Sequence, residues 1–80
     1  MDTDWFWELD DSGREAFRER IAEYEAEGYR DGGIDYSSEE WFENMTYIID
    51  PDGKKIPGTT AYDDPYSVES WRLLFEQLAR

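Results

Sequence analysis

One stretch of the chain, residues 10–28, constrains the fold most because it has the pattern of a single amphipathic helix. Phe17, Ile21 and Tyr24 recur at the i, i+4, i+7 spacing of a core-facing stripe. Acidic residues recur at every fourth position on the opposite side, and we call these four the acidic ladder: Glu15, Glu19, Glu23 and Glu27. The fold must therefore cover one side of this helix, while the ladder carries negative charge into solvent.

Capping residues mark the two ends of this helix. At the start, Ser12 and Glu15 fit a capping box, and Asp11 is an equally good cap. At the other end, Gly28 occupies the position expected for a helix C-cap glycine. We therefore expect the helix to end at about Glu27.

The segment before this helix, Thr3–Leu9, alternates between two sides. Trp5, Trp7 and Leu9 fall on one of them, which is the pattern of a strand with a heavy apolar face. We interpret the segment as a core strand. The alternative is an exposed Trp anchor at an interface, since Trp is enriched among binding hot spots.

A β-hairpin is predicted in the second half of the chain. Thr46–Asp50 is β-branched and aromatic, Pro51–Gly53 has the composition of a tight turn, and Lys54–Ile56 begins the return strand. Residues 59–64 form a loop or a short further strand.

The remaining segments supply a connection and two helices. Tyr29–Tyr36 is interpreted as a turn-rich connection that bends at Gly32–Gly33. A short helix is predicted from Ser37 to about Met45, with Ser37 and Glu40 as a second capping box. The last helix opens at Asp64–Pro65 or at Ser67. Its predicted core face is Val68, Trp71, Phe75 and Leu78, widened by Leu74.

This order of elements predicts one compact domain over residues 1–80, because no repeat or long linker divides the chain. The expected class is α+β, with a small three-stranded antiparallel sheet packed with two longer helices and one short helix. An all-helical bundle closed by the hairpin is the alternative.

Composition narrows the chemistry. The 80 residues contain no cysteine and no histidine, which removes disulfides, the usual zinc sites and the Ser-His and Cys-His nucleophiles. Four Trp, six Tyr and four Phe must supply most of the core. We expect neither an enzyme nor a cofactor or metal site. No apolar run is long enough for a membrane span and no signal-peptide pattern is present, so we expect a cytoplasmic protein.

The net charge of −13 predicts the kind of partner. Such a chain is repelled by nucleic acid and by anionic membranes, so its natural charge partner is a basic protein surface. Residues 1–43 carry −11 and residues 44–80 carry −2. This uneven distribution favours a binding patch over the uniform acidic coat of a halophilic protein. The oligomeric state stays open.

The candidate binding face is the acidic ladder together with acids that follow it. Successive ladder residues lie about 6 Å apart along a helix axis, a spacing comparable to that of phosphates on one nucleic-acid strand. A groove lined with Arg and Lys to hold DNA or RNA would accept such a row. The proposed partner-binding residues are Glu15, Glu19, Glu23, Glu27, Asp31, Asp35, Glu39, Glu40 and Glu43.

Small size, acidity, aromatic richness and the ladder together give a profile that resembles the small phage-encoded inhibitors of bacterial defence. Acidic anti-CRISPR proteins and other DNA mimics are examples. The resemblance covers mainly residues 1–43 and includes no motif match. It implies occupation of the nucleic-acid-binding or PAM-reading site of a CRISPR effector or restriction enzyme, in the host bacterial cytoplasm. An immunity or antitoxin protein that plugs a basic nuclease, and a halophilic domain, are the alternatives.

Overall fold

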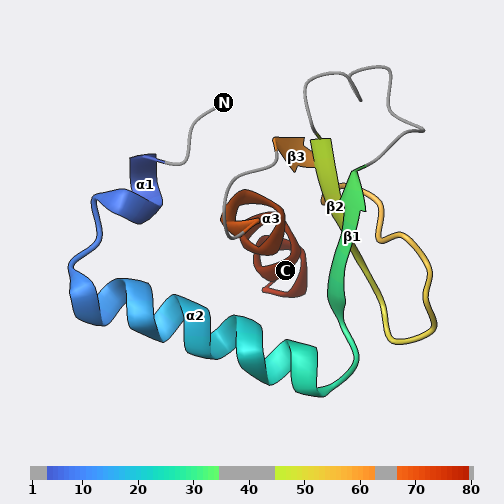
Figure 1. Cartoon of the computed structure of the whole chain (residues 1–80), viewed down its shortest axis with the longest axis horizontal. Helices are drawn as coiled ribbons and strands as arrows, with labels where there is room; N and C mark the ends of the chain where they lie inside the picture. The colour runs from blue at the N-terminus through green and yellow to red at the C-terminus, as the bar shows by residue number, and fades with distance from the viewer. Residues whose placement is uncertain (1–3, 35–44, 63–66, 80) are drawn as a thin grey trace.

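The computed structural model describes residues 4–34, 45–62 and 67–79. It is an α+β arrangement with an antiparallel sheet, so the predicted class is confirmed and the all-helical alternative is wrong. The elements in chain order are helix α1 (Asp4–Trp7), helix α2 (Asp11–Ala26), strand β1 (Arg30–Ile34), strand β2 (Met45–Ile49), strand β3 (Ala61–Tyr62) and helix α3 (Val68–Leu78) (Figure 1).

The sheet is built on β2. Its long partner is β1, which runs antiparallel to it with Arg30 opposite Ile49. At the other edge, the two residues of β3 pair antiparallel with Met45 and Thr46. The predicted antiparallel sheet is thus present, whereas a full third strand stays a prediction.

Strand β1 occupies a segment that we predicted to be a turn-rich connection, and that prediction is wrong. The two glycines make a bulge inside the strand, because the register shifts between Asp31 and Ile34 and Gly33 has a φ of +82°. Gly32 is needed for a different reason. A Cβ atom there would lie 2.4 Å from the Tyr47 ring, which packs directly over the glycine backbone.

The predicted tight turn after β2 is confirmed. The Asp50 carboxylate accepts from the backbone amides of Asp52 and Lys54, both at 2.9 Å, and the Asp50 amide donates to the Lys54 carbonyl at 2.8 Å. The predicted return strand at residues 54–56 shortens to an isolated bridge between Ile49 and Lys55. A side chain takes the place of a backbone acceptor on this side of β2, since the Ile48 amide donates to the hydroxyl of buried Thr59 at 3.0 Å.

The first segment is helix α1, so the predicted strand at residues 3–9 is wrong. Phe6 is fully buried, whereas Trp7 and Leu9, predicted to face the core, are 49% and 36% exposed. A single helical turn points neighbouring side chains in different directions, which lets Phe6 enter the core. It also directs the Trp5 indole to Glu69 of α3, with a hydrogen bond of 2.8 Å.

Helix α2 begins and ends as a capped helix. Its N-cap is Asp10, whose carboxylate accepts from the Gly13 amide at 2.7 Å, and not Ser12 or Asp11 as predicted. Its end agrees with the prediction. Gly28 has a φ of +108°, and the amides of Gly28 and Tyr29 donate to the carbonyls of Glu25 and Tyr24, which is a Schellman motif.

Helix α3 lies at the centre of the molecule, between the sheet on one side and α1 and α2 on the other (Figure 1). The core cluster joins Ile48 of β2 to Trp71, Leu74 and Phe75 of α3. The predicted stripe of α2 covers this cluster, and Phe17 is one example, with its ring centroid 5.4 Å from that of Phe75.

Two predictions about the helices need correction or fall outside the structure. Leu78, predicted to belong to the core face of α3, is 47% exposed because it lies in the last turn, beyond the packed part of the helix. The predicted short helix from Ser37 lies outside the described residues except for Met45, which begins β2.

Candidate functional site

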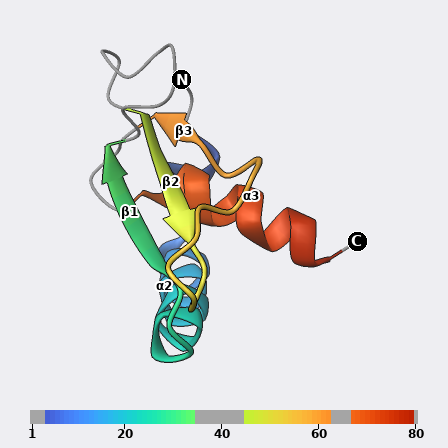
Figure 2. The same cartoon turned by 90° about the vertical axis from the view of Figure 1, so that its right-hand side faces the viewer.

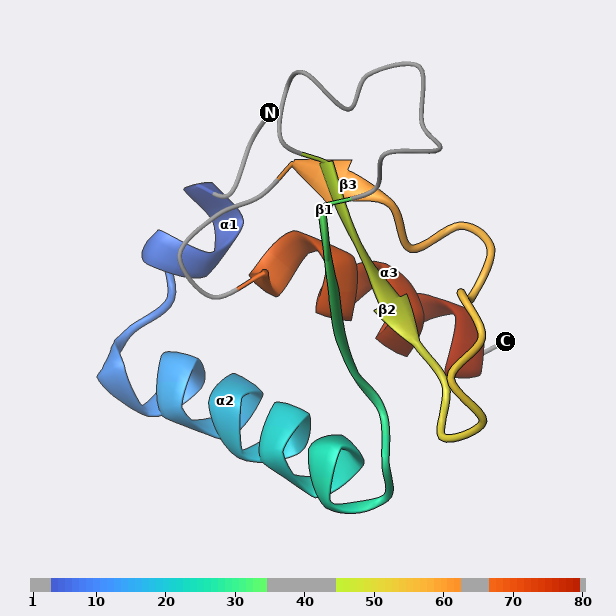
Figure 3. The ribbon, with the colours of Figure 1, turned by 45° about the vertical axis from the view of Figure 1, so that its right-hand side comes forward.

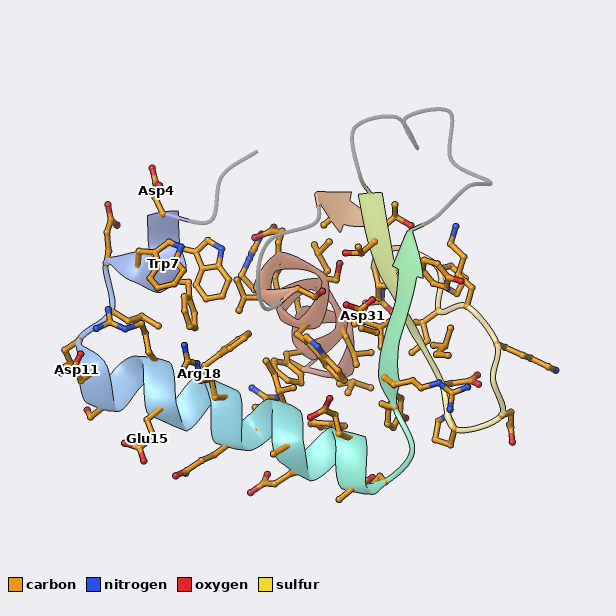
Figure 4. The ribbon with its side chains drawn as sticks, viewed as in Figure 1. Asp4, Trp7, Asp11, Glu15, Arg18 and Asp31 are labelled. Atoms are coloured by element: carbon orange, nitrogen blue, oxygen red, sulfur yellow. The ribbon has the colours of Figure 1, made fainter. Side chains whose placement is uncertain are left out.

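The acidic ladder lies on the side of α2 that faces away from the rest of the molecule. All four of its glutamates are exposed, as predicted, and no residue of α2 is fully buried. Figures 2 and 3 show α2 running below α3 and the sheet, with its outer side uncovered by any described element. Glu15 points away from the body of the molecule, while Arg18 points towards it (Figure 4). The ladder is therefore a continuous surface feature.

The three arginines of α2 are turned towards the packed side of the helix. Arg14 donates to the Trp7 carbonyl at 3.2 Å. The guanidinium carbon of Arg18 lies 6.0 Å from the centroid of the Phe6 ring, and that of Arg20 lies 4.2 Å from the centroid of the Phe75 ring. Aromatic rings and a backbone carbonyl thus contact the three guanidinium groups, although Arg18 and Arg20 stay exposed.

The ladder carries its negative charge without a neutralising base from the described part of the chain. The ion pairs there join Arg14 to Asp11 and Arg72 to two glutamates of α3, and none of them includes a ladder residue. Small side chains lie between the acids, since Ala16, Ala22 and Ala26 are all exposed. The outer side of α2 is therefore acidic and carries no bulky side chain at these three positions, so that another surface could approach the carboxylates closely.

The acids predicted to extend this face beyond α2 have different outcomes. Asp31 is held in a structural role, because its carboxylate accepts from the Gly33 amide at 2.7 Å and from the hydroxyl of buried Ser67 at the start of α3. We therefore remove Asp31 from the candidate face. The other four predicted residues, Asp35, Glu39, Glu40 and Glu43, lie outside the described residues.

Glu69 of α3, an acid that is buried in the described part of the chain, has a structural role. It is 2% exposed and binds both the Trp5 indole and the guanidinium of Arg72. Arg72 also reaches Glu76 at 2.9 Å. The hydrogen bond to Glu69 is the main cause that raises the pKa of Arg72, partial burial opposes it, and the charges of Glu69 and Glu76 add to the increase. This network joins α1 to α3 and uses its charges internally.

The preferred interpretation of residues 3–9 as a core strand did not place an apolar pair at the surface, although an exposed Trp was its alternative. Trp7 and Leu9 were placed in the core on the assumption that their segment is a strand. The signal that could have found them is Asp4 at the head of the segment, since an acid in a first turn favours a helix there. A depression of about 350 Å³ on the first turns of α2 is lined by Asp11, Arg14, Glu15 and Arg18.

Other kinds of site find little support in the described ranges. Residues 4–34, 45–62 and 67–79 contain no group of three or more acids gathered as metal ligands. Nor does any helix in these ranges have the length and apolar character needed to cross a bilayer. No protein-family model, curated protein or solved structure matches this chain.

Proposed function

We propose that this protein is an inhibitor that binds the basic nucleic-acid-binding groove of a bacterial defence nuclease or CRISPR–Cas effector. The acidic ladder takes the place of a row of phosphates and excludes the nucleic acid by competition. The observation that carries the proposal is a row of four exposed glutamates along α2 that form no ion pair within the described part of the chain. The three arginines of the same helix contact aromatic rings or a backbone carbonyl.

The spacing of the ladder suits such a groove. Four residues advance a helix by about 6 Å, so the ladder presents negative charges at intervals of the same order as phosphates along a strand. The side chains of Lys and Arg that contact a phosphate backbone would meet carboxylates at similar positions. The exposed alanines beside the ladder leave room for this approach.

The ladder also has a cost in stability, which supports a binding role. Acids four residues apart on a helix repel each other, and acids near a helix C-terminus face the negative end of its dipole. Glu23 and Glu27 lie at that end of α2, and its last turn contains no base. A partner with a basic surface offsets both the repulsion between the acids and their unfavourable interaction with the helix dipole when it binds.

The inhibitor acts by occupation, without chemistry on its target. The chain has no His or Cys to serve as a nucleophile or general base near neutral pH. Glu69, the fully buried acid among the described residues, is already bound to Trp5 and Arg72. We therefore infer a non-enzymatic, competitive mechanism.

A competition assay tests the proposal. A panel of purified restriction nucleases and CRISPR effectors is mixed with labelled DNA or with target duplex, and displacement by the protein is measured. We expect displacement from at least one member, and its loss in Glu19→Lys/Glu23→Lys. The matched control is Glu8→Lys/Asp52→Lys, which changes the net charge equally at two exposed acids outside α2.

Two results would contradict the proposal. One is that no member of the panel releases its nucleic acid. The other is that the ladder variant and its control lose displacement equally, which would mean that total charge matters and the ladder does not. Measurements at different salt concentrations distinguish this proposal from the halophilic alternative. A halophilic domain should unfold at low ionic strength, whereas this inhibitor should stay folded and bind best there.

A further inference from the structure

Strand β1 forms one edge of the sheet. The strand order is β1-β2-β3, so within the described part of the chain β1 pairs with β2 on one side and with no strand on the other (Figure 2). Arg30, Asp31 and Gly33 of this strand are exposed. An edge strand presents unpaired backbone N–H and C=O groups, to which a strand of another molecule can pair. Strand β1 is therefore the place where a second copy could extend the sheet.

A bulge of one residue interrupts this edge. Between the paired positions Asp31 and Ile34, two glycines of β1 lie opposite the single residue Tyr47 of β2. The second of these glycines, Gly33, has a φ of +82°, which is outside the range of a regular strand. A bulge bends its strand and disrupts the ladder of hydrogen bonds. A regular strand of another molecule therefore cannot pair along the whole of this edge.

The side chain of Asp31 closes the bulge. One oxygen of its carboxylate accepts from the Gly33 amide at 2.7 Å, so this amide is not offered to a neighbouring strand. The other oxygen accepts from the hydroxyl of Ser67, which is 5% exposed and begins α3. A buried group thus fixes the position of an exposed carboxylate. Bulges and charged side chains are two devices that prevent pairing between sheet edges.

The other side of β2 is closed by the chain itself. Strand β3 there has two residues, and such a short strand offers few groups for further pairing. Next to it, the Ile48 amide donates to the Thr59 hydroxyl at 3.0 Å, and the Ile48 carbonyl accepts from the Ile56 amide at 2.9 Å. Strand β1 is the longer of the two described edges. Its protection therefore decides whether the sheet can be extended.

We propose that Asp31, Gly32 and Gly33 form an edge guard, which prevents β1 from pairing with the β1 strand of a second copy. The net charge of −13 also keeps two copies apart, but salt screens this repulsion and a bound basic partner neutralises it. The guard depends on backbone geometry and on a short hydrogen-bonded contact, so it persists when the charge is screened. It keeps the protein monomeric under both conditions.

Sedimentation at high salt tests the inference with a variant that removes both parts of the guard. Deletion of Gly33 leaves Gly32 alone opposite Tyr47, and Asp31→Ala removes the acceptor and the charge at the edge. We expect the apparent mass of this double variant to double from 9.5 kDa as its concentration rises, while the unchanged protein stays monomeric. Hydrogen exchange at the β1 amides of the double variant should slow at least about tenfold on association.

Two matched variants separate the guard from a loss of charge or of packing. Asp52→Ala removes an equal charge at an exposed acid in the turn after β2. Ser67→Ala removes the buried hydroxyl that binds Asp31 and leaves the bulge and the Gly33 contact in place. Both variants should stay monomeric at the same salt and protein concentrations. If either associates as strongly as the double variant, the edge guard is not the cause.

Hydrogen exchange in the monomer keeps the inference testable where the double variant does not fold. The Gly33 amide binds the Asp31 side chain, whereas the Gly53 amide, in a residue with a similar φ of +83°, binds the backbone carbonyl of Asp50. Asp31→Ala alone should speed exchange at Gly33 at least about tenfold and leave Gly53 unchanged.

Three results would overturn the inference. The first is an unchanged rate of exchange at the Gly33 amide in Asp31→Ala. The second is a folded double variant that stays monomeric at every concentration, or that associates without slower exchange at β1. The third is association of the unchanged protein through β1, since the guard would then fail to block the edge.

Discussion

Helices α2 and α3 both carry acids, but the acids of α2 lie mostly in solvent whereas α3 buries one of its two. In α3, Glu69 is 2% exposed and bound to Trp5 and Arg72, so its charge holds two helices together. In α2, the ladder glutamates are exposed and have no base beside them in the described part of the chain. The difference teaches that the buried Glu69 of α3 contributes to the fold, whereas the ladder glutamates along α2 oppose it.

The largest loss of stability is expected when the Phe75 ring, which packs between α2 and α3, is removed. Phe75 is 4% exposed and its ring contacts those of Phe17, Tyr24 and Trp71. We expect Phe75→Ala to lower the free energy of unfolding by about 3–5 kcal/mol, because it leaves a cavity between α2 and α3. Urea denaturation measures this loss. Leu78→Ala on the same helix is the control and should change stability by less than about 0.5 kcal/mol.

The next largest effect on stability compares Glu69 and Glu76, the two acids that form ion pairs with Arg72. Glu69→Gln should destabilise the fold by about 2 kcal/mol, because it weakens charged hydrogen bonds in a buried position. Glu76→Gln removes the exposed partner of the same Arg72 and should cost less than about 0.5 kcal/mol. Thermal and urea unfolding of both variants gives the comparison. Equal losses would mean that burial of Glu69 is not what makes it important.

A variant of Asp31 tests whether an acid outside the outer side of α2 serves the fold or the binding of a partner. We expect Asp31→Ala to destabilise the protein by about 1 kcal/mol, since the hydroxyl of Ser67 and the amide of Gly33 lose their acceptor. Its effect on displacement of nucleic acid from an inhibited effector should be small, because Asp31 does not belong to the outer side of α2. A strong loss of displacement with unchanged stability would return Asp31 to the binding face.

The smallest expected effect is an increase in stability, from a substitution at Glu27. Glu27→Lys places a base at the negative end of the α2 dipole and removes repulsion from Glu23, so we expect a gain of about 0.5 kcal/mol in stability. The gain should shrink as salt rises, because both terms are screened. Unfolding at two ionic strengths measures it, with Glu8→Lys as the control of equal charge change. A loss of stability would show that Glu27 supports the fold.

Helix α2 could be predicted from sequence almost completely, and the reason is physical. Its apolar stripe, its exposed ladder and its terminal Gly28 are local properties of one periodic segment. The missed N-cap is a local error as well, because three capping residues follow each other from Asp10 to Ser12 and only the observed bond to the Gly13 amide selects among them.

The segments around Trp5 and Gly32 could not be predicted in the same way. Alternation in residues 3–9 fits a strand, but the contact that decides the outcome joins Trp5 to Glu69, sixty-four residues away. The two glycines suggest a bend, yet the Tyr47 ring turns Gly32 into part of a strand. The candidate site follows the same rule. The ladder could be predicted from spacing, whereas the ring contacts of Arg18 and Arg20 and the structural role of Asp31 depend on tertiary contacts.

One paired measurement on Glu19→Lys/Glu23→Lys tests the central claim most directly. The stability of the variant and its displacement of nucleic acid from an inhibited effector are measured on the same preparation. If the ladder is a binding surface maintained against the fold, stability should be equal or higher while displacement falls at least about tenfold. Retained displacement by a folded variant, or a loss explained by unfolding, would contradict the claim.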